Sequence, residues 1–177
     1  MAAPGESHIY PLPTTQSRQT SPLTTPTAYI ILGGGVAGLT TALELHSRSP
    51  TSPIILLAKH LPGDLSLSYT SPWAGANWLS VATDNGRQEA WDAVTYAKFG
   101  ELADEAREAG VLRMPIRAVF DNAWEEAGVL SEGTGRVWYG GLVGGLRVVE
   151  GGELPEGARC GFECDSFVVD VTRYLPW

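Results

Sequence analysis

The sequence predicts an α/β fold that begins with a parallel β-α-β unit, and three observations support this. A short apolar run at residues 29–32 is followed at once by three glycines. Apolar residues at helical spacing come next, and a second apolar run occupies residues 54–58. Continuous apolar runs are typical of strands in a parallel sheet, and a crossover helix joins two such strands.

The first strand is bounded by Thr and Pro on one side and by glycines on the other. The helix is expected over residues 36–47, because Leu39, Ala42 and Leu43 recur at helical spacing. Proline and serine residues then end the helix, and the second strand follows.

Residues 59–80 read as an irregular loop rich in Pro, Gly and Ser. Connections of this length are usually functional or disordered. Three aromatic side chains, Tyr69, Trp73 and Trp78, argue against disorder. We therefore expect a structured functional loop.

A long helix is predicted over residues 88–110, with Gly110 as its C-terminal stop. The predicted apolar stripe consists of Ala90, Trp91, Val94, Ala97, Leu102 and Ala106.

Two further strands are predicted, at residues 113–120 and 161–171, and a helix begins at residue 172. Residues 121–157 are glycine-rich and give no prediction. The candidate core residues of the last strand are Phe162, Val168 and Val169.

Composition excludes several kinds of partner. The 177-residue chain has a formal net charge of −8 and lacks clustered Lys or Arg, which argues against nucleic acid and against a polybasic membrane anchor. No apolar run approaches the roughly 20 residues that span a bilayer. Residues 1–27, rich in Ser, Thr and Pro, are predicted to be a disordered tail.

The potentially reactive side chains form no recognisable constellation. Cys160 and Cys164 have neither zinc-binding nor redox spacing, so we interpret them as buried small residues of a protein in a reducing compartment. His8, His46 and His60 are scattered, without metal-ligand spacing. The sequence therefore predicts no metal site, no Ser/His/Asp arrangement and no catalytic side chain.

The glycine turn carries the clearest chemistry. Gly33, Gly35 and Gly38 fit G-x-G-x-x-G in the confirming context of a strand before and a helix after. The first glycine permits a tight turn, the second lets a pyrophosphate approach the backbone, and the third lets the helix pack closely. With Val36 and Ala37, they are predicted to hold the ADP part of a dinucleotide at the helix N-terminus.

The acidic residue that usually ends the second strand and binds ribose is absent. Lys59 and His60 stand there and could donate to ribose or phosphate. A basic residue at this position also suits NADP, so the motif alone leaves FAD and NADP open.

Two blocks, Lys-His-Leu-Pro-Gly-Asp at residues 59–64 and Tyr-Thr-Ser-Pro-Trp-Ala-Gly-Ala-Asn-Trp at residues 69–78, closely resemble fungal D-amino-acid oxidases. Residues 36–45 are similar to the first helix of that family. Residues 170–177 resemble its passage from strand to helix just before mid-chain. The resemblance covers nearly everything after residue 28 and is looser over residues 82–159.

The resemblance implies a Rossmann-like FAD-binding domain plus the start of a second, substrate-binding domain, truncated at its end. Residues 28–177 would be the N-terminal part of this FAD-binding oxidoreductase, with about 113–171 on the substrate-domain side. The resemblance also implies oxidation of D-amino acids to imino acids, with hydrogen peroxide as the second product. The imino acids then give 2-oxo acids and ammonia. Hydride passes to the flavin, and no side chain is an obligatory base.

The family's flavin contacts carry over to the glycine turn, to the strand end and to the loop at residues 70–77. The small side chains of Ala74, Gly75 and Ala76 would let a flat ring lie against their backbone, whose polar groups could pair with the flavin edge. The residues transferred in the loop are Thr70, Ser71, Ala74, Gly75, Ala76 and Asn77.

Two alternatives stay open. The family's substrate-clamping arginine and framing tyrosines lie in its second half, so the chain could be an inactive fragment that retains part of an FAD site. It could also belong to a related flavin amine oxidase acting on D-aspartate, glycine or an N-methyl amino acid.

The resemblance implies a D-amino acid and oxygen as partners and a peroxisomal or cytoplasmic location, and leaves a homodimer open. We expect the 177-residue chain to have poor stability.

Overall fold

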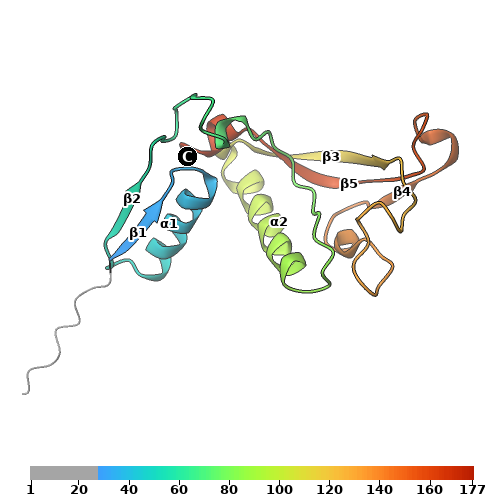
Figure 1. Cartoon of the computed structure of the whole chain (residues 1–177), viewed down its shortest axis with the longest axis horizontal. Helices are drawn as coiled ribbons and strands as arrows, with labels where there is room; N and C mark the ends of the chain where they lie inside the picture. The colour runs from blue at the N-terminus through green and yellow to red at the C-terminus, as the bar shows by residue number, and fades with distance from the viewer. Residues whose placement is uncertain (1–27) are drawn as a thin grey trace, which may run out of the picture.

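The computed structural model describes residues 28–177, so the predicted tail and His8 lie outside the described residues. At one end of the molecule β1 (Tyr29–Leu32), α1 (Val36–Arg48) and β2 (Ile54–Leu57) form one unit (Figure 1). The two strands pair in parallel, with Ile31 opposite Leu56. The predicted β-α-β unit is confirmed, with the helix one residue longer and the second strand one residue shorter than expected.

The sheet of this unit has only two strands, and α1 covers one of its faces. On the other face Ile30 and Leu32 are 64% and 79% exposed, beside the half-exposed Ile55 and Leu57. Continuous apolar runs are typical of parallel strands that are buried, but in this unit one face of the two strands is exposed. Two strands and one helix bury one face only, and a full Rossmann fold is not formed by residues 28–177.

The other end of the molecule is an antiparallel sheet in the order β3-β5-β4 (Figure 1). It consists of β3 (Val111–Phe120), β4 (Arg147–Val149) and β5 (Cys160–Val169). β3 and β5 pair along their whole length, from Val111 opposite Val169 to Phe120 opposite Cys160. Both predicted strands are confirmed, and β4 lies where no element was predicted.

Helix α2 (Arg87–Glu105) lies between the two ends of the molecule (Figure 1). It ends before Gly110, because a 3₁₀ turn, η2 (Arg107–Ala109), follows. Gly110 does stop the helical segment, with φ +73° in the left-handed region that glycine adopts without strain.

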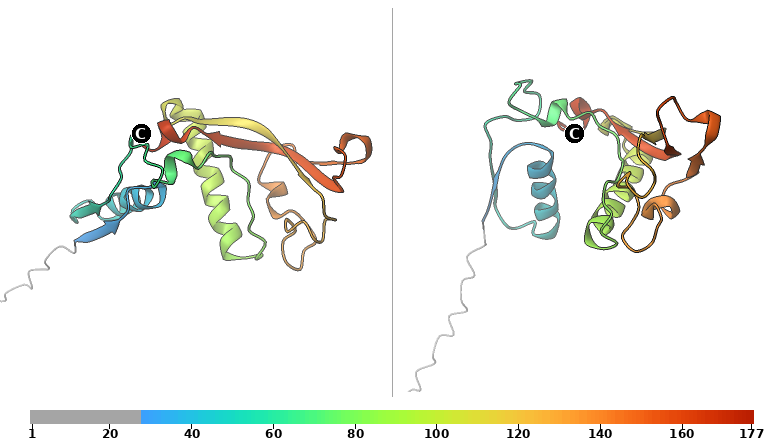
Figure 2. Two further views of the ribbon diagram at one scale, coloured as in Figure 1. Left: turned by 45° about the horizontal axis from the view of Figure 1, so that its top comes forward. Right: turned by 45° about the vertical axis from the view of Figure 1, so that its right-hand side comes forward.

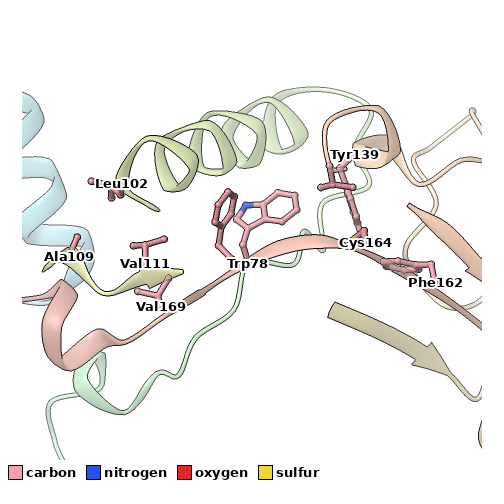
Figure 3. Packing of buried hydrophobic residues seen from close by; sticks show 10 residues of the cluster. Trp78, Leu102, Ala109, Val111, Tyr139, Phe162, Cys164 and Val169 are labelled. Atoms are coloured by element: carbon pink, nitrogen blue, oxygen red, sulfur yellow. The ribbon is translucent and has the colours of Figure 1, made fainter. Parts of the chain in front are cut away.

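The main core forms where α2 packs against β5 (Figure 3). Trp78 and Tyr139 meet edge to face with ring centroids 5.4 Å apart, and Tyr96 lies 4.9 Å from Phe167. Phe162 and Phe167 are fully buried. Such aromatic pairs combine large apolar burial with a preferred geometry, so they fix how the helix sits on the sheet.

The predicted apolar stripe of α2 is confirmed at Leu102 and Ala106, which lie in or against the core, and is wrong over residues 90–97. Trp91 and Val94 are 58% and 69% exposed, whereas Tyr96 and Phe99 pack against the core. The helix has apolar residues on more than one face, and the aromatic side chains that meet Phe167 decide which face is buried.

Several short helical elements complete the fold, and the last of them lies near the β-α-β unit. The remaining 3₁₀ turns are η1 (Ser71–Trp73), η3 (Trp138–Gly141) and η4 (Gly151–Glu153). The predicted last helix forms as α3 (Val171–Tyr174), where Asp170 caps the N-terminus by accepting from the Thr172 N–H. Helix α3 contacts η1, and Trp177 lines a small pocket with Val36 and Leu43 of α1, so the C-terminus lies near the β-α-β unit (Figure 2).

Both cysteines are free and buried on β5, as predicted for small packing residues. Burial raises the pKa of the Cys164 thiol to about 11.

We therefore expect native Cys164 to resist alkylation at pH 8 and to react fully in guanidinium chloride. The neutral thiol stabilises the fold below the unfolded pKa of about 8.5, and this contribution is lost as pH rises through 11. Mass spectrometry of a Cys160→Ser variant measures this thiol alone, and rapid native labelling would contradict its burial.

Candidate functional site

The glycine turn joins β1 to α1 with little room for side chains. Gly33 has φ +104°, and its N–H donates to the Leu57 carbonyl at 2.8 Å. A Cβ at Gly38 would overlap the Gly33 carbonyl oxygen, and one at Gly34 would lie 2.6 Å from the His60 carbonyl oxygen. The tight turn and the close packing of the helix start thus need glycine, as the motif predicts.

The loop after β2 folds onto this turn. The Tyr69 hydroxyl donates to the Gly34 carbonyl at 2.6 Å, and the Val36 N–H donates to Ser71 Oγ at 3.1 Å. A Cβ added to Gly35 would lie 2.7 Å from the same Oγ atom. The structure therefore brings the predicted glycine turn together with the predicted loop.

Tyr69 and Gly34 are residues of this contact that the sequence prediction left out of the site. Gly34 is only a variable position of the motif, and Tyr69 was noted only as an aromatic side chain of the loop. Burial raises the pKa of Tyr69, so its hydroxyl remains a donor across the neutral range. Its ring also stacks on His60, with centroids 5.8 Å apart.

Tyr69→Phe is expected to lower the free energy of unfolding by about 1–2 kcal/mol, because it removes a buried hydrogen bond to the glycine turn. Urea unfolding followed by circular dichroism measures the loss. Tyr29→Phe at the start of β1 serves as the control. Equal stability of Tyr69→Phe and the parent chain would contradict the role of this contact.

His60 belongs to a polar network within the loop. Its Nδ1 atom contacts the Asp64 carboxylate, and its Nε2 atom lies 2.8 Å from Ser68 Oγ. Sequence patterns did not identify this contact, because Asp64 and Ser68 stand four and eight positions after His60 in a loop without periodicity. The hydrogen bond from His60 and the Ser66 N–H hold the pKa of Asp64 below its usual range.

This network serves the loop more readily than hydrolysis. Asp64 also accepts from the Ser66 N–H at 2.8 Å, which closes a turn, and the Ser66 and Ser68 hydroxyls lie 3.1 Å apart. Both partners of His60 are thus engaged in local loop structure. Lys59 is exposed beside this network.

The loop at residues 70–77 differs from its prediction in one respect. Both backbone groups of Ala76 pair with Val169, at 3.0 and 2.8 Å, so they are not available to a flavin edge. Since backbone groups alternate along an extended segment, Asn77 directs its own N–H and C=O away from β5. Ala74, Gly75 and Asn77 are exposed.

The two tryptophans of the loop have different roles. The Trp78 side chain is buried in the main core, and its backbone N–H donates to the Phe167 carbonyl at 2.8 Å. Trp73 is 54% exposed, and its Nε1 donates to the Ser66 carbonyl at 3.2 Å. Core packing is therefore confirmed for Trp78 only.

The donor set at the turn fits the pyrophosphate of a dinucleotide. The first turn of α1 has no acidic side chain, and its N-terminal N–H groups have no intrahelical acceptor. Gly33 leaves open space where a Cβ would stand, and Ala37 is exposed. Lys59 and His60 add potential donors at the end of β2. The Val36 N–H already donates to Ser71 Oγ, so an anion at this helix N-terminus would be favoured by the remaining N–H groups of the first turn and by the helix dipole.

Other kinds of site find less support in the part of the chain that the structure describes. Across residues 28–177 no three His, Cys, Asp or Glu side chains gather as a group that could hold a metal ion. None of the helices described is long and apolar enough to cross a bilayer.

No protein-family model matches the chain. A D-amino-acid oxidase of Schizosaccharomyces pombe is 32% identical over 152 residues, and one of Fusarium vanettenii is 33% identical over 153 residues. A D-aspartate oxidase of Talaromyces thermophilus is 31% identical over 172 residues. These alignments cover 86%, 84% and 86% of this chain but only 42%, 42% and 46% of the relatives.

The chain therefore spans less than half the length of these curated relatives. The relatives named D-amino-acid oxidase confirm the resemblance seen at residues 59–64 and 69–78. Together with the D-aspartate oxidase they support an oxidoreductase family.

Proposed function

We propose that this chain is part of an FAD-dependent oxidase of the D-amino-acid oxidase family. The reaction would convert a D-amino acid and oxygen to an imino acid and hydrogen peroxide, and water would then release a 2-oxo acid and ammonia. The observation that carries the proposal is the contact of the glycine turn with the loop through Tyr69 and Ser71. The two relatives named D-amino-acid oxidase also support this proposal.

The residues proposed to hold the cofactor divide by the part they would bind. Gly33, Gly35, Val36, Ala37 and Gly38 would hold the pyrophosphate at the start of α1. Bound FAD would accept the substrate hydride and pass the electrons to oxygen.

The strand end and the loop would bind the rest of the cofactor. Lys59 and His60 would donate to ribose or phosphate. Gly75 and Asn77 would offer backbone groups to the flavin edge, in place of Ala76, whose groups pair with β5. Thr70, Ser71 and Ala74 complete the proposed loop contacts.

D-aspartate is a second candidate substrate, because relatives named D-aspartate oxidase also match. One of Cryptococcus neoformans var. grubii is 38% identical over 106 residues, which cover 56% of this chain and 27% of the relative. A chain that binds FAD without catalysis remains the other alternative. The proposal includes a peroxisomal or cytoplasmic location.

The test begins with FAD binding by the purified chain, followed by absorbance and by calorimetric titration. Peroxide release is then measured with D-alanine and D-aspartate, with L-alanine as the control. We expect visible flavin absorbance and D-specific peroxide. A colourless protein that does not bind added FAD would overturn the proposal, and FAD binding without peroxide would favour the non-catalytic alternative.

A further inference from the structure

An open cavity of about 530 Å³ lies between the start of α2 and the loop that leads into η3. None of the residues of the glycine turn or of the loop at residues 59–77 lines it. Its volume falls in the range of small-molecule sites, which is about 300–1,000 Å³. The cavity is thus of a suitable size for a ligand site, and none of the residues that line it is proposed to bind the flavin.

The cavity is bounded by a tight hairpin. The Ser131 N–H donates to the Arg136 carbonyl at 2.8 Å, and the Thr134 hydroxyl donates to the Ser131 carbonyl at 2.9 Å. The Glu132 N–H donates to the Thr83 carbonyl at 2.8 Å, which ties the hairpin to the segment before α2. These bonds give the lining residues fixed positions.

Two buried polar side chains line this cavity. Glu89 is 8% exposed, and one carboxylate oxygen accepts from the Asn85 N–H at 2.9 Å. Ser131 is 3% exposed, and its hydroxyl has no hydrogen-bond partner within residues 28–177. A buried hydroxyl without a partner is unusual, and a ligand in the cavity would supply that partner if its binding turned the Ser131 side chain toward it.

The remaining lining supplies a cation and a flat apolar surface. Arg136 is exposed and makes no ion pair with any other residue that the structure describes. The Trp138 indole N–H donates to Ser80 Oγ at 3.1 Å, and this hydroxyl donates to Asp92 at 2.7 Å. The indole ring is thus held in place beside the charged groups.

We propose that this cavity binds a free α-amino acid. The ammonium group would donate to the Glu89 carboxylate and the Ser131 hydroxyl, and the guanidinium of Arg136 would hold the carboxylate. The amino-acid side chain would lie against Trp138. A carboxylate and a guanidinium in one cavity match a small zwitterion better than an anion or a cation alone. The site goes beyond the proposed oxidation, because it contains none of the cofactor residues.

The test is a titration of the ¹⁵N-labelled 177-residue chain with L-alanine, followed by the Trp138 indole N–H resonance. A Trp138→Phe variant assigns that resonance. We expect a saturable shift, with an affinity at least about tenfold lower in Glu89→Gln and in Arg136→Gln. Methylamine and acetate, which each carry one of the two charges, should bind about tenfold more weakly than L-alanine.

Ser131→Ala separates a binding role from a packing role. It removes an unpaired buried hydroxyl, so the free protein should be as stable as the parent chain or more stable. Binding of L-alanine should nevertheless weaken by about threefold or more, as expected for a lost hydrogen bond. Glu101→Gln and Arg48→Gln, which change exposed charges elsewhere, should leave binding unchanged.

Several results would overturn the proposal. They are the absence of a Trp138 shift, unchanged affinity in both Glu89→Gln and Arg136→Gln, or equal binding of methylamine or acetate alone. Gly35→Val distinguishes this site from the flavin site: it should prevent FAD binding and leave the L-alanine titration unchanged. Loss of L-alanine binding in a folded Gly35→Val protein would assign the amino acid to the other site.

Discussion

Gly35→Val is expected to lower the affinity for FAD by on the order of 100-fold or more, which corresponds to about 2.7 kcal/mol. The first carbon of the new side chain would lie 2.7 Å from Ser71 Oγ, the atom that accepts from the Val36 N–H. Its two methyl groups would occupy the approach of the pyrophosphate to the helix N-terminus. The substitution therefore disturbs both the proposed ligand and the loop that packs on the turn.

Calorimetric titration of FAD into parent and variant chains measures this effect. Gly152→Val is the matched control, because an added Cβ there meets no atom within 4 Å and the residue lies in η4. Circular dichroism checks that both variants are folded. A folded Gly35→Val chain that binds FAD like the parent would remove the glycine turn from the proposed cofactor site.

Phe167→Ala is expected to lower the free energy of unfolding by about 3–5 kcal/mol, as for other large-to-small changes in a core. Phe167 is fully buried on β5, and its ring meets those of Tyr96 and Phe99. The guanidinium of Arg113 also lies 5.0 Å from its ring centroid. Truncation would leave a cavity at the centre of the contact between α2 and the sheet.

Urea unfolding with a two-state analysis measures this loss. Val94→Ala on α2 is the control, because Val94 is 69% exposed and its truncation should change stability by no more than about 0.5 kcal/mol. If Phe167→Ala cost less than about 1 kcal/mol, the packing of α2 on β5 would not be the main core.

Local patterns predicted much of the fold. The elements β1, α1, β2, β3 and β5 form within a few residues of their predicted bounds, because strand and helix periods are properties of short segments. β4 was missed because it has only three residues in a glycine-rich region. The buried face of α2 was predicted wrongly over residues 90–97, because the choice of face there depends on Phe167, which is distant in the sequence.

The candidate site shows the same division. The turn at residues 33–38 could be predicted because each glycine answers a local need of the backbone. The contacts of Tyr69 with Gly34 and of Ser71 with Val36 join residues 35 positions apart, and no sequence period marks them. The pairing of Ala76 with Val169 likewise depends on a strand near the end of the chain.

By itself, the sequence determined the β-α-β unit, its glycine turn and the resemblance to D-amino-acid oxidases, because periodicity, backbone sterics and a distinctive ten-residue block are all local. Only the tertiary structure decided which groups of the loop are free to meet a cofactor and which face of α2 is buried. It also decided that Glu89, Ser131 and Arg136 share one cavity. These features depend on packing between segments far apart in the chain, and the free energy of that packing is not encoded in any one segment.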